Sequence, residues 1–184
     1  MSMILASQSP RRRELLAREG VAFRVEVRDT EEVHDASLSP ELLCAINAAS
    51  KAEAVAREFP GEVVIGADTL VFIDGMPLGK PADETQAVAM LLQLQGRTHS
   101  VCTAVAVIMP DGSRRDFTET SYVTFRPLDE AAIRHYMSLV HVYDKAGAYA
   151  IQEHGELIIE RFEGDLDNVI GLPVTRLLQV LNPA

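Results

Sequence analysis

Hydrophobic and polar positions follow two different periods along the chain, and each period predicts a different kind of element. Residues 3–6 are a short apolar run of the kind found in strands. Ser9-Pro10 then supplies a capping hydroxyl and a proline suited to the first helical position, so a helix is expected from there to Gly20. Alternation over residues 22–27 predicts a second strand. The chain is therefore expected to open as strand, loop, helix, strand.

The same signals recur through the rest of the chain. Ser39-Pro40 repeats the cap and proline, Asp83 precedes an apolar helical pattern with Gln86 three residues on, and Asp74-Gly75 is a strong hairpin turn. Further helices are expected from residue 40 until Pro60-Gly61 and at residues 84–95, 128–140 and 173–181, and strands at 63–65, 70–73, 101–109, 117–125, 149–152 and 157–159.

This alternation of helices and strands predicts an α/β fold with a mixed β-sheet and flanking helices. The chain has 184 residues, enough to bury a sizeable core, and it has no internal repeat or low-complexity linker. We therefore expect one domain over residues 1–184, built either as one body or as two lobes around a central cleft.

Composition and charge exclude several classes of protein. Seventeen basic residues against 27 acidic ones give a net charge of −10, which disfavours polymeric nucleic acid and anionic membranes as partners. Cys44 and Cys102 are too few for a disulfide framework or a four-ligand zinc site. The start of the chain lacks the basic flank and long apolar region of a signal peptide. The sequence predicts a cytoplasmic protein.

Three arginines, Arg11 to Arg13, occupy the first turn of the first predicted helix. That end of a helix already presents positive charge through its macrodipole and its unpaired N–H groups. A bound phosphate would resolve the conflict, because backbone donors and guanidinium groups would then converge on it. The pattern alone is equally compatible with three arginines that are exposed to solvent.

Asp68 follows an apolar run, and Gly66 and Ala67 leave room there for another group to approach the backbone. A carboxylate at a buried strand end can serve as a general base or a metal ligand, although a turn-capping aspartate has the same spacing. Thr69 beside it is either a ligand contact or an ordinary strand threonine.

Other polar residues add candidate contacts for a phosphate-rich ligand. Lys80 lies between glycine and proline in a stretch that differs from a P-loop in its glycine spacing, and remains a candidate phosphate contact. Lys51 lies among alanines of a predicted helix, where a solvated side chain is the ordinary expectation. Gln152 is either a contact to a nucleotide base or a solvated amide. The five histidines lack HExxH spacing, and no GxSxG elbow is present.

Taken together, six segments resemble the Maf family of nucleoside triphosphate pyrophosphatases, in family order and over nearly the whole chain. They are residues 5–16 (LASQSPRRRELL), 66–69 (GADT), 78–81 (LGKP), 96–101 (GRTHSV), 144–152 (DKAGAYAIQ) and 168–173 (NVIGLP). The resemblance implies a bilobed fold like that of inosine-triphosphate pyrophosphatases, a homodimer, a divalent metal such as magnesium or manganese, and hydrolysis of a nucleotide to its monophosphate and pyrophosphate.

The resemblance also implies roles for single residues. In the branch of the family that acts on dTTP and UTP, the catalytic proton acceptor falls on Asp68 and the specificity positions fall on Arg11, Thr69 and Gln152. The phosphate and substrate-binding positions fall on Ser7, Arg12, Lys51 and Lys80.

The candidate metal ligands implied by the resemblance are Asp68 and, as the weakest match, Glu32. Family members show Asp-x-Asp-Glu in that loop, whereas this chain has Asp29-Thr30-Glu31-Glu32. Two alternatives stay open at this point: a Maf-like pyrophosphatase with another base preference, such as 7-methyl-GTP, and a nucleotide-binding regulator of cell division that does not turn its ligand over.

Overall fold

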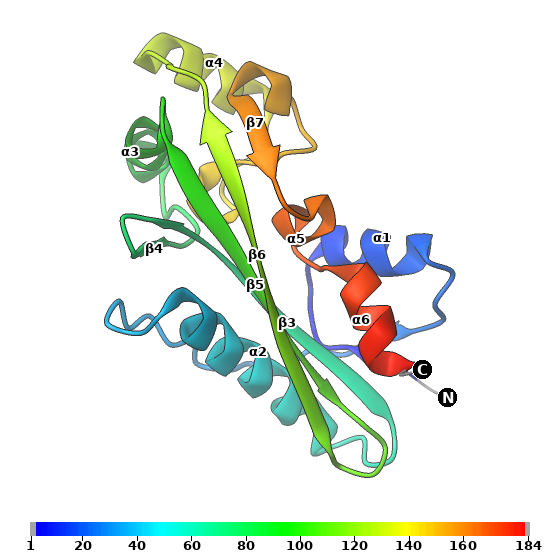
Figure 1. The fold of residues 1–184 in the computed structure, drawn as a ribbon. Coiled ribbons are helices and arrows are strands. Elements are labelled where there is room, and N and C mark those ends of the chain that lie inside the picture. Colours follow the sequence, from blue (N-terminus) through cyan, green and yellow to red (C-terminus); the bar gives the residue numbers. More distant parts are fainter. Residues whose placement is uncertain (1–2, 183–184) are drawn as a thin grey trace.

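A mixed, seven-stranded β-sheet forms the centre of the protein in a computed structural model that describes residues 3–182 (Figure 1). Six strands lie in the order β2-β1-β3-β5-β6-β7, and β4 pairs with β3 off this path. The strands are β1 (Met3–Leu5), β2 (Arg24–Val25), β3 (Val63–Ile73), β4 (Met76–Leu78), β5 (Thr98–Ile108), β6 (Arg114–Phe125) and β7 (Ile159–Glu163). The mixed α/β fold expected from the sequence is confirmed.

The long strand β3 changes its partner partway along one edge. Its other edge pairs continuously with β5 in antiparallel register. On the first edge, β1 pairs in parallel with residues 63–65, and β4 pairs antiparallel with residues 71–73. Among the described pairings, residues 66–70 therefore have no strand beside them on that edge, and this opening lies between two regular parts of the sheet.

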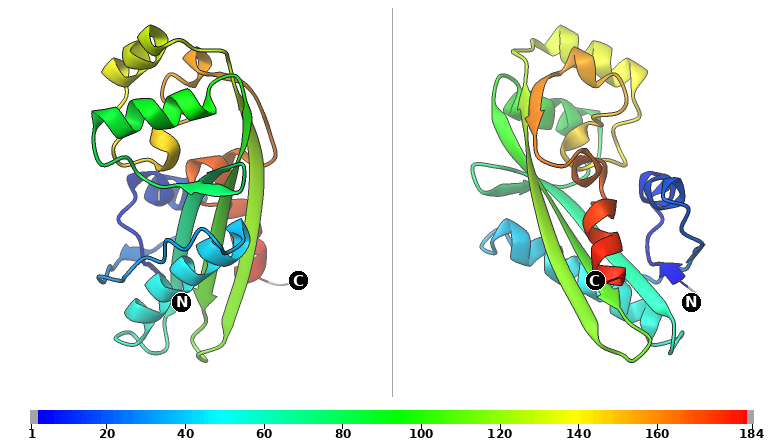
Figure 2. Two further views of the ribbon diagram at one scale, coloured as in Figure 1. Left: turned by 90° about the vertical axis from the view of Figure 1, so that its left-hand side faces the viewer. Right: turned by 45° about the vertical axis from the view of Figure 1, so that its right-hand side comes forward.

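Helices cover both faces of the sheet, as the two views in Figure 2 show. Helix α2 (Pro40–Ala56) packs on one face against β1, β3 and β5, while α1 (Pro10–Arg18), α5 (Leu166–Ile170) and α6 (Val174–Leu181) lie on the other. Helices α3 (Glu84–Leu94) and α4 (Glu130–Leu139) pack together against the far end of β5 and β6. Two short 3₁₀ turns, η1 (Ala146–Ala148) and η2 (Gly155–Leu157), connect α4 to β7.

The predicted helix starts are confirmed by their capping bonds. The side chains of Ser9, Ser39 and Asp83 each accept a hydrogen bond from a backbone N–H in the first turn of α1, α2 and α3. These bonds satisfy donors that a helix start otherwise leaves unpaired. After α1, Gly20 takes a left-handed φ of 70°, which glycine adopts without steric cost. The local sequence therefore fixes where these helices begin.

Several sequence predictions of strands were wrong, most of them in extent and one, residues 149–152, entirely. The runs 63–65 and 70–73 belong to one continuous strand, because Asp68 and its neighbours keep extended pairing with β5. Residues 149–152, expected as a strand, follow η1 as an irregular segment, since Gly147 and Ala148 have positive φ and turn the chain away from the sheet. Of residues 157–159, only Ile159 belongs to a strand, since Leu157 ends η2 and Ile158 is its cap, and β2 keeps only two of the residues expected of it.

None of the helices within residues 3–182 is long and apolar enough to cross a membrane. The division of the chain into two lobes around a cleft stays a prediction.

Candidate active site

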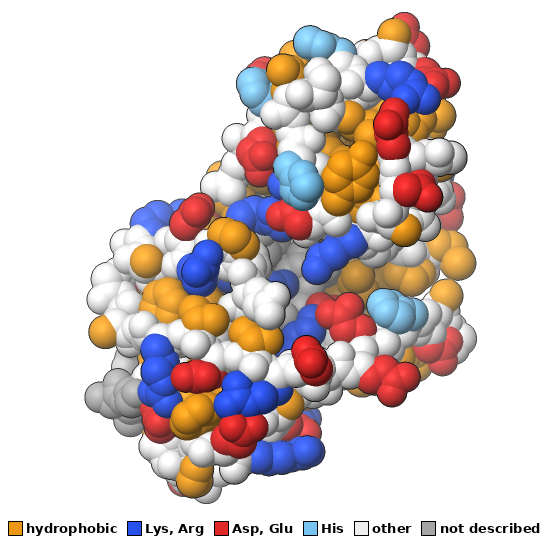
Figure 3. All heavy atoms as spheres, turned by 180° about the vertical axis from the view of Figure 1, so that it is seen from behind, with side chains coloured by type: hydrophobic (Ala, Val, Ile, Leu, Met, Phe, Trp, Pro, Cys, Tyr) orange, Lys and Arg blue, Asp and Glu red, His pale blue; other side chains and the backbone are white. Residues whose placement is uncertain are grey.

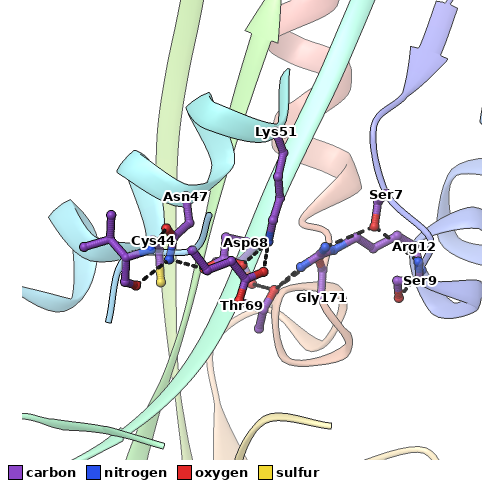
Figure 4. Close-up of polar contacts among 12 residues, drawn as sticks. Ser7, Ser9, Arg12, Cys44, Asn47, Lys51, Asp68, Thr69 and Gly171 are labelled. Carbon is purple, nitrogen blue, oxygen red and sulfur yellow. Dashed lines mark hydrogen bonds and ion pairs between the residues drawn. The ribbon is translucent and has the colours of Figure 1, made fainter. Parts of the chain in front are cut away.

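The predicted site residues gather at the opening in the edge of β3. Asp68 and Thr69 are adjacent there, and because successive residues of a strand point to opposite faces, they reach different layers of the molecule. Asp68 faces α2, and Thr69 faces α1 and α5 (Figure 4). The opening is thus lined from both faces of the sheet by polar groups.

Gly66 allows α2 to pack close enough to reach Asp68. A Cβ built on Gly66 would lie 2.3 Å from the carbonyl oxygen of Ala48 and 2.7 Å from the backbone nitrogen of Ala52. No real Cβ fits at these distances, so only glycine permits this approach of helix to strand. The room that the sequence predicted beside Asp68 is confirmed, and the group that fills it is α2.

Asp68 is held by two donors from successive turns of α2. Its Oδ1 accepts from Lys51 Nζ at 2.7 Å, and its Oδ2 accepts from Asn47 Nδ2 at 3.3 Å (Figure 4). Asn47 is itself fixed, because its amide also bonds the backbone N–H and carbonyl of Val33. Asp68 is only 7% exposed. The alternative that Asp68 caps a turn is excluded, since it lies inside β3 and its carboxylate points to α2.

Lys51 joins Asp68 to the acidic loop that precedes α2. Its Nζ lies 2.7 Å from Asp68 Oδ1 and 2.7 Å from Glu32 Oε1. Burial works to raise the pKa of Glu32, but the hydrogen bond and charge of Lys51 outweigh it, with a smaller contribution from Lys80, and the pKa is lowered. Glu32 is therefore held as a carboxylate. The expectation that Lys51 is solvated was wrong, because its side chain bridges two carboxylates.

On the opposite face, Arg12 reaches back from the first turn of α1 to three acceptors. Its Nε donates to the carbonyl oxygen of Gly171 at 2.8 Å, Nη1 to Ser7 Oγ at 3.1 Å and Nη2 to Thr69 Oγ1 at 2.9 Å (Figure 4). Burial lowers the pKa of Arg12, and the negative charge of Asp68 opposes that effect. A guanidinium remains protonated under such a shift. Arg12 thus brings a fixed positive charge to the opening.

The arginine triplet separates into three environments. Arg12 points into the opening, whereas Arg13 is exposed. Arg11 Nη1 lies 3.1 Å from Asp144 Oδ2, and Asp144 in turn pairs with the buried Lys145. Burial tends to raise the pKa of Asp144, but Lys145 and then Arg11 lower it further than burial raises it. The alternative that the arginine side chains are simply exposed to solvent is therefore excluded for Arg11 and Arg12.

Lys80 and Gln152 lie outside this network. Both are exposed, and neither has a hydrogen bond or ion pair among those of the described residues. Lys80 follows β4 and Gln152 follows η1, both in irregular segments. The N–H of Gly147 in η1 bonds the carbonyl of Gly79 at 3.0 Å, which ties η1 to the segment that carries Lys80. We call Lys80 and Gln152 the rim residues of the proposed site.

The surface of the molecule is hollowed on one face. Figure 3 shows a depression in the middle of that face, bordered by Lys and Arg side chains and also by Asp and Glu side chains. Two other hollows contain none of the predicted site residues: one of about 540 Å³ between the C-terminal end of α2 and the β5–β6 turn, and one of about 650 Å³ along the outer side of α2.

Three polar residues of the site were missed by the sequence analysis. Asn47 lies four residues before Lys51, so the helical period alone was a signal that both share one face. Gly171 and Thr103 gave no such signal, because a backbone carbonyl and a strand threonine acquire their role only when distant segments meet.

The carboxylates at the opening fit a divalent cation that is shared with the phosphate oxygens of a ligand. Within residues 3–182, no group of three or more His, Cys, Asp or Glu side chains is arranged to hold a metal. Magnesium, however, is commonly bound by one or two carboxylates together with substrate phosphates. Asp68 and Glu32 supply two carboxylates beside one another, joined through Lys51. The residues fit a cation that arrives with a phosphorylated ligand.

Comparison with known proteins places this chain in one family. A family model described as Maf-like protein matches residues 2–184, and the chain belongs to the Maf family. The chain is 61% identical to the dTTP/UTP pyrophosphatase of Akkermansia muciniphila over 180 residues, covering 98% of this chain and 95% of that protein. It is 46% identical to the dTTP/UTP pyrophosphatase of Bacillus velezensis over 179 residues, covering 97% and 94%.

A solved structure with the same fold is that of the Staphylococcus aureus Ham1 protein. The TM-score is 0.55 at 18% identity, with 98% of this chain and 97% of that chain covered. A HAM1 protein from Coxiella burnetii gives the same TM-score at 14% identity, with both chains fully covered. At these identities the likeness concerns the fold alone.

Proposed function

We propose that this protein is a nucleoside triphosphate pyrophosphatase that hydrolyses dTTP and UTP to the nucleoside monophosphate and pyrophosphate. The observation that carries the proposal is the opening in β3, where one held carboxylate lies between cations from both faces of the sheet. Cleavage of a triphosphate between its α- and β-phosphates requires a group that accepts a proton from water and positive charge for the leaving pyrophosphate. The relatives named dTTP/UTP pyrophosphatase support the choice of substrate.

Asp68 is proposed as the proton acceptor for the attacking water. A carboxylate has about four lone-pair sites, and Lys51 and Asn47 take one on each oxygen of Asp68. Sites on both oxygens therefore remain for water. The two α2 donors also fix the orientation of the carboxylate before substrate arrives, which removes reorganisation from the reaction.

Lys51 and Arg12 are proposed to bind the triphosphate. Lys51 has three N–H donors and uses two on Asp68 and Glu32, and Arg12 has five and uses three on protein acceptors. Each cation thus retains free donors for phosphate oxygens. Ser7, which accepts from Arg12, and Lys80 at the rim complete the proposed phosphate contacts.

Asp68 and Glu32 are the residues that would hold a magnesium or manganese ion together with the triphosphate. When bound, such an ion offsets negative charge on the phosphate oxygens. Arg11, Thr69 and Gln152 are proposed to read the pyrimidine. We propose further that the protein works in the cytoplasm as a homodimer, without a membrane or polymeric nucleic-acid partner, as the net charge of −10 supports.

The test is pyrophosphate release from dTTP, UTP, CTP, 7-methyl-GTP and ITP with magnesium or manganese, with orthophosphate scored separately. Asp68→Asn should lower kcat by roughly 1,000-fold, because the amide no longer accepts the proton from water. Asp74→Asn is the matched control, since Asp74 is an exposed aspartate of the β3–β4 turn that pairs with Arg97, and it should retain wild-type activity.

Other results of the same assay would contradict the proposal in different ways. Activity confined to 7-methyl-GTP would keep the reaction and replace the base preference. Nucleotide binding without any product would indicate the regulator instead. Near-wild-type turnover by Asp68→Asn would remove Asp68 from the chemistry.

A further inference from the structure

A pair of threonine hydroxyls lies behind the opening, where β3 meets β5. Thr103 is directly opposite Thr69 in the antiparallel ladder, and the two Oγ1 atoms are 2.9 Å apart. Thr103 is completely buried, and its Oγ1 also lies 3.1 Å from the backbone carbonyl oxygen of Asn168 in α5. Arg12 Nη2 approaches Thr69 from the other side at 2.9 Å.

The direction of the hydroxyl hydrogens in this chain follows from counting donors. A carbonyl oxygen only accepts, and a hydroxyl has one hydrogen to donate. Thr103 therefore donates to Asn168, and Thr69 donates to Thr103. In the reverse arrangement Thr69 would donate to the carbonyl of Gly171 at the longer distance of 3.4 Å. That arrangement also leaves the buried carbonyl oxygen of Asn168 without its hydroxyl donor, and a buried acceptor that loses its donor destabilises the fold.

This direction decides what Thr69 offers to a ligand. Its hydrogen points inward to Thr103, and one of its two lone pairs accepts from Arg12. The group left for a ligand is the second lone pair, so Thr69 acts there only as an acceptor. Thymine and uracil carry a donating N3–H, whereas the N3 of cytosine is a bare acceptor. Placed against position 3 of the base, which the proposal below requires, an acceptor at Thr69 would complement the first two bases and oppose the third.

We propose that Thr103 is a positioning residue that sets base selectivity by holding Thr69 as a hydrogen-bond acceptor. The inference rests on the proposed function, because it concerns how the same pocket tells one pyrimidine triphosphate from another. Thr103 itself contacts no substrate, since it is buried behind Thr69. Removing its hydroxyl leaves the hydrogen of Thr69 only the carbonyl of Gly171 as a protein acceptor, at the longer distance of 3.4 Å, so that the hydrogen can turn toward the ligand and serve cytosine as a donor.

The experiment compares kcat/KM for dTTP and dCTP in the full-length protein and its variants. Thr103→Val keeps the side-chain shape without the hydroxyl, and the dTTP-to-dCTP ratio of kcat/KM should fall about fivefold, the equivalent of one ordinary hydrogen bond. Thr103→Ser restores a hydroxyl and should restore most of the ratio. Thr103→Ala removes the same hydroxyl and carries the same expectation if the valine variant folds poorly.

Thr98→Val is the matched control, because Thr98 is also a β5 threonine whose hydroxyl bonds another threonine, Thr124, at 2.8 Å. It should leave the ratio unchanged. Equal losses on dTTP and dCTP in Thr103→Val and Thr103→Ala would make Thr103 merely structural and overturn the inference alone. A wild-type protein inactive on both dTTP and UTP would overturn the proposed function and this inference with it.

Discussion

The centre and the rim of the proposed site are built in different ways. At the centre, Asp68, Thr69 and Arg12 lie on a strand and a helix and are each fixed by at least two contacts. At the rim, Lys80 and Gln152 lie on turns, are exposed and have no partner among the described hydrogen bonds and ion pairs. The difference indicates that the centre is organised in the absence of a ligand, whereas the contacts of the rim residues are proposed to form only with substrate.

This difference has an energetic consequence. Groups that are already oriented lose little entropy when the ligand binds, and they stabilise developing charge without reorganisation. An exposed lysine or glutamine has to be immobilised first, at a cost of about 0.5–1.5 kcal/mol for a flexible side chain. Substitutions at the centre should therefore have larger effects on catalysis than substitutions at the rim.

After Asp68→Asn, the largest effect that would sharpen this comparison is expected at Arg12. Arg12→Lys keeps the charge, but a lysine ammonium has no planar fork with which to reach Gly171, Ser7 and Thr69 together. We expect kcat/KM for dTTP to fall roughly 100-fold. The control is Arg13→Lys, on the same helical turn and exposed, which should change kcat/KM less than twofold. Similar values for the two variants would show that the centre requires charge alone.

A second test acts on the packing that places α2 against β3. Gly66→Ala would force a methyl group against the backbone of Ala48 and Ala52, which are part of a helix and yield little. Urea denaturation should show a loss of about 1–3 kcal/mol in the free energy of unfolding. The activity should fall as well, since α2 carries Lys51 and Asn47. Gly79→Ala is the control for stability, because a Cβ there meets open space.

Most of the centre could be predicted from the sequence because its signals are local. Ser9-Pro10 and Ser39-Pro40 fix the starts of two helices, and thereby the positions of Arg12 and Lys51. The apolar run that ends at Asp68 predicts a buried strand. The resemblance to the Maf family implies that these segments form one site.

The remaining contacts depend on pairing between distant segments, which no local pattern encodes. Thr103 reaches Thr69 through the register of β3 and β5, 34 residues apart in the chain. The expected strand at residues 149–152 failed for a related reason. Its apolar residues fit a strand, but the positive φ angles of Gly147 and Ala148 turn the segment, and Tyr149 is buried against His99. Tertiary contacts overrode the local preference.

The smallest effect is expected at the rim, from Gln152→Ala. The side chain is exposed and has no contact to lose among the described residues, so the free energy of unfolding should change by less than about 0.5 kcal/mol. If Gln152 contacts the base only in the complex, kcat/KM for dTTP should fall about tenfold, mainly through KM. Gln93→Ala, on the exposed side of α3, should change neither quantity. A loss in Gln152→Ala as large as that of Arg12→Lys would contradict the division into a fixed centre and an adaptable rim, because it would place an essential contact on a segment that carries no preformed support.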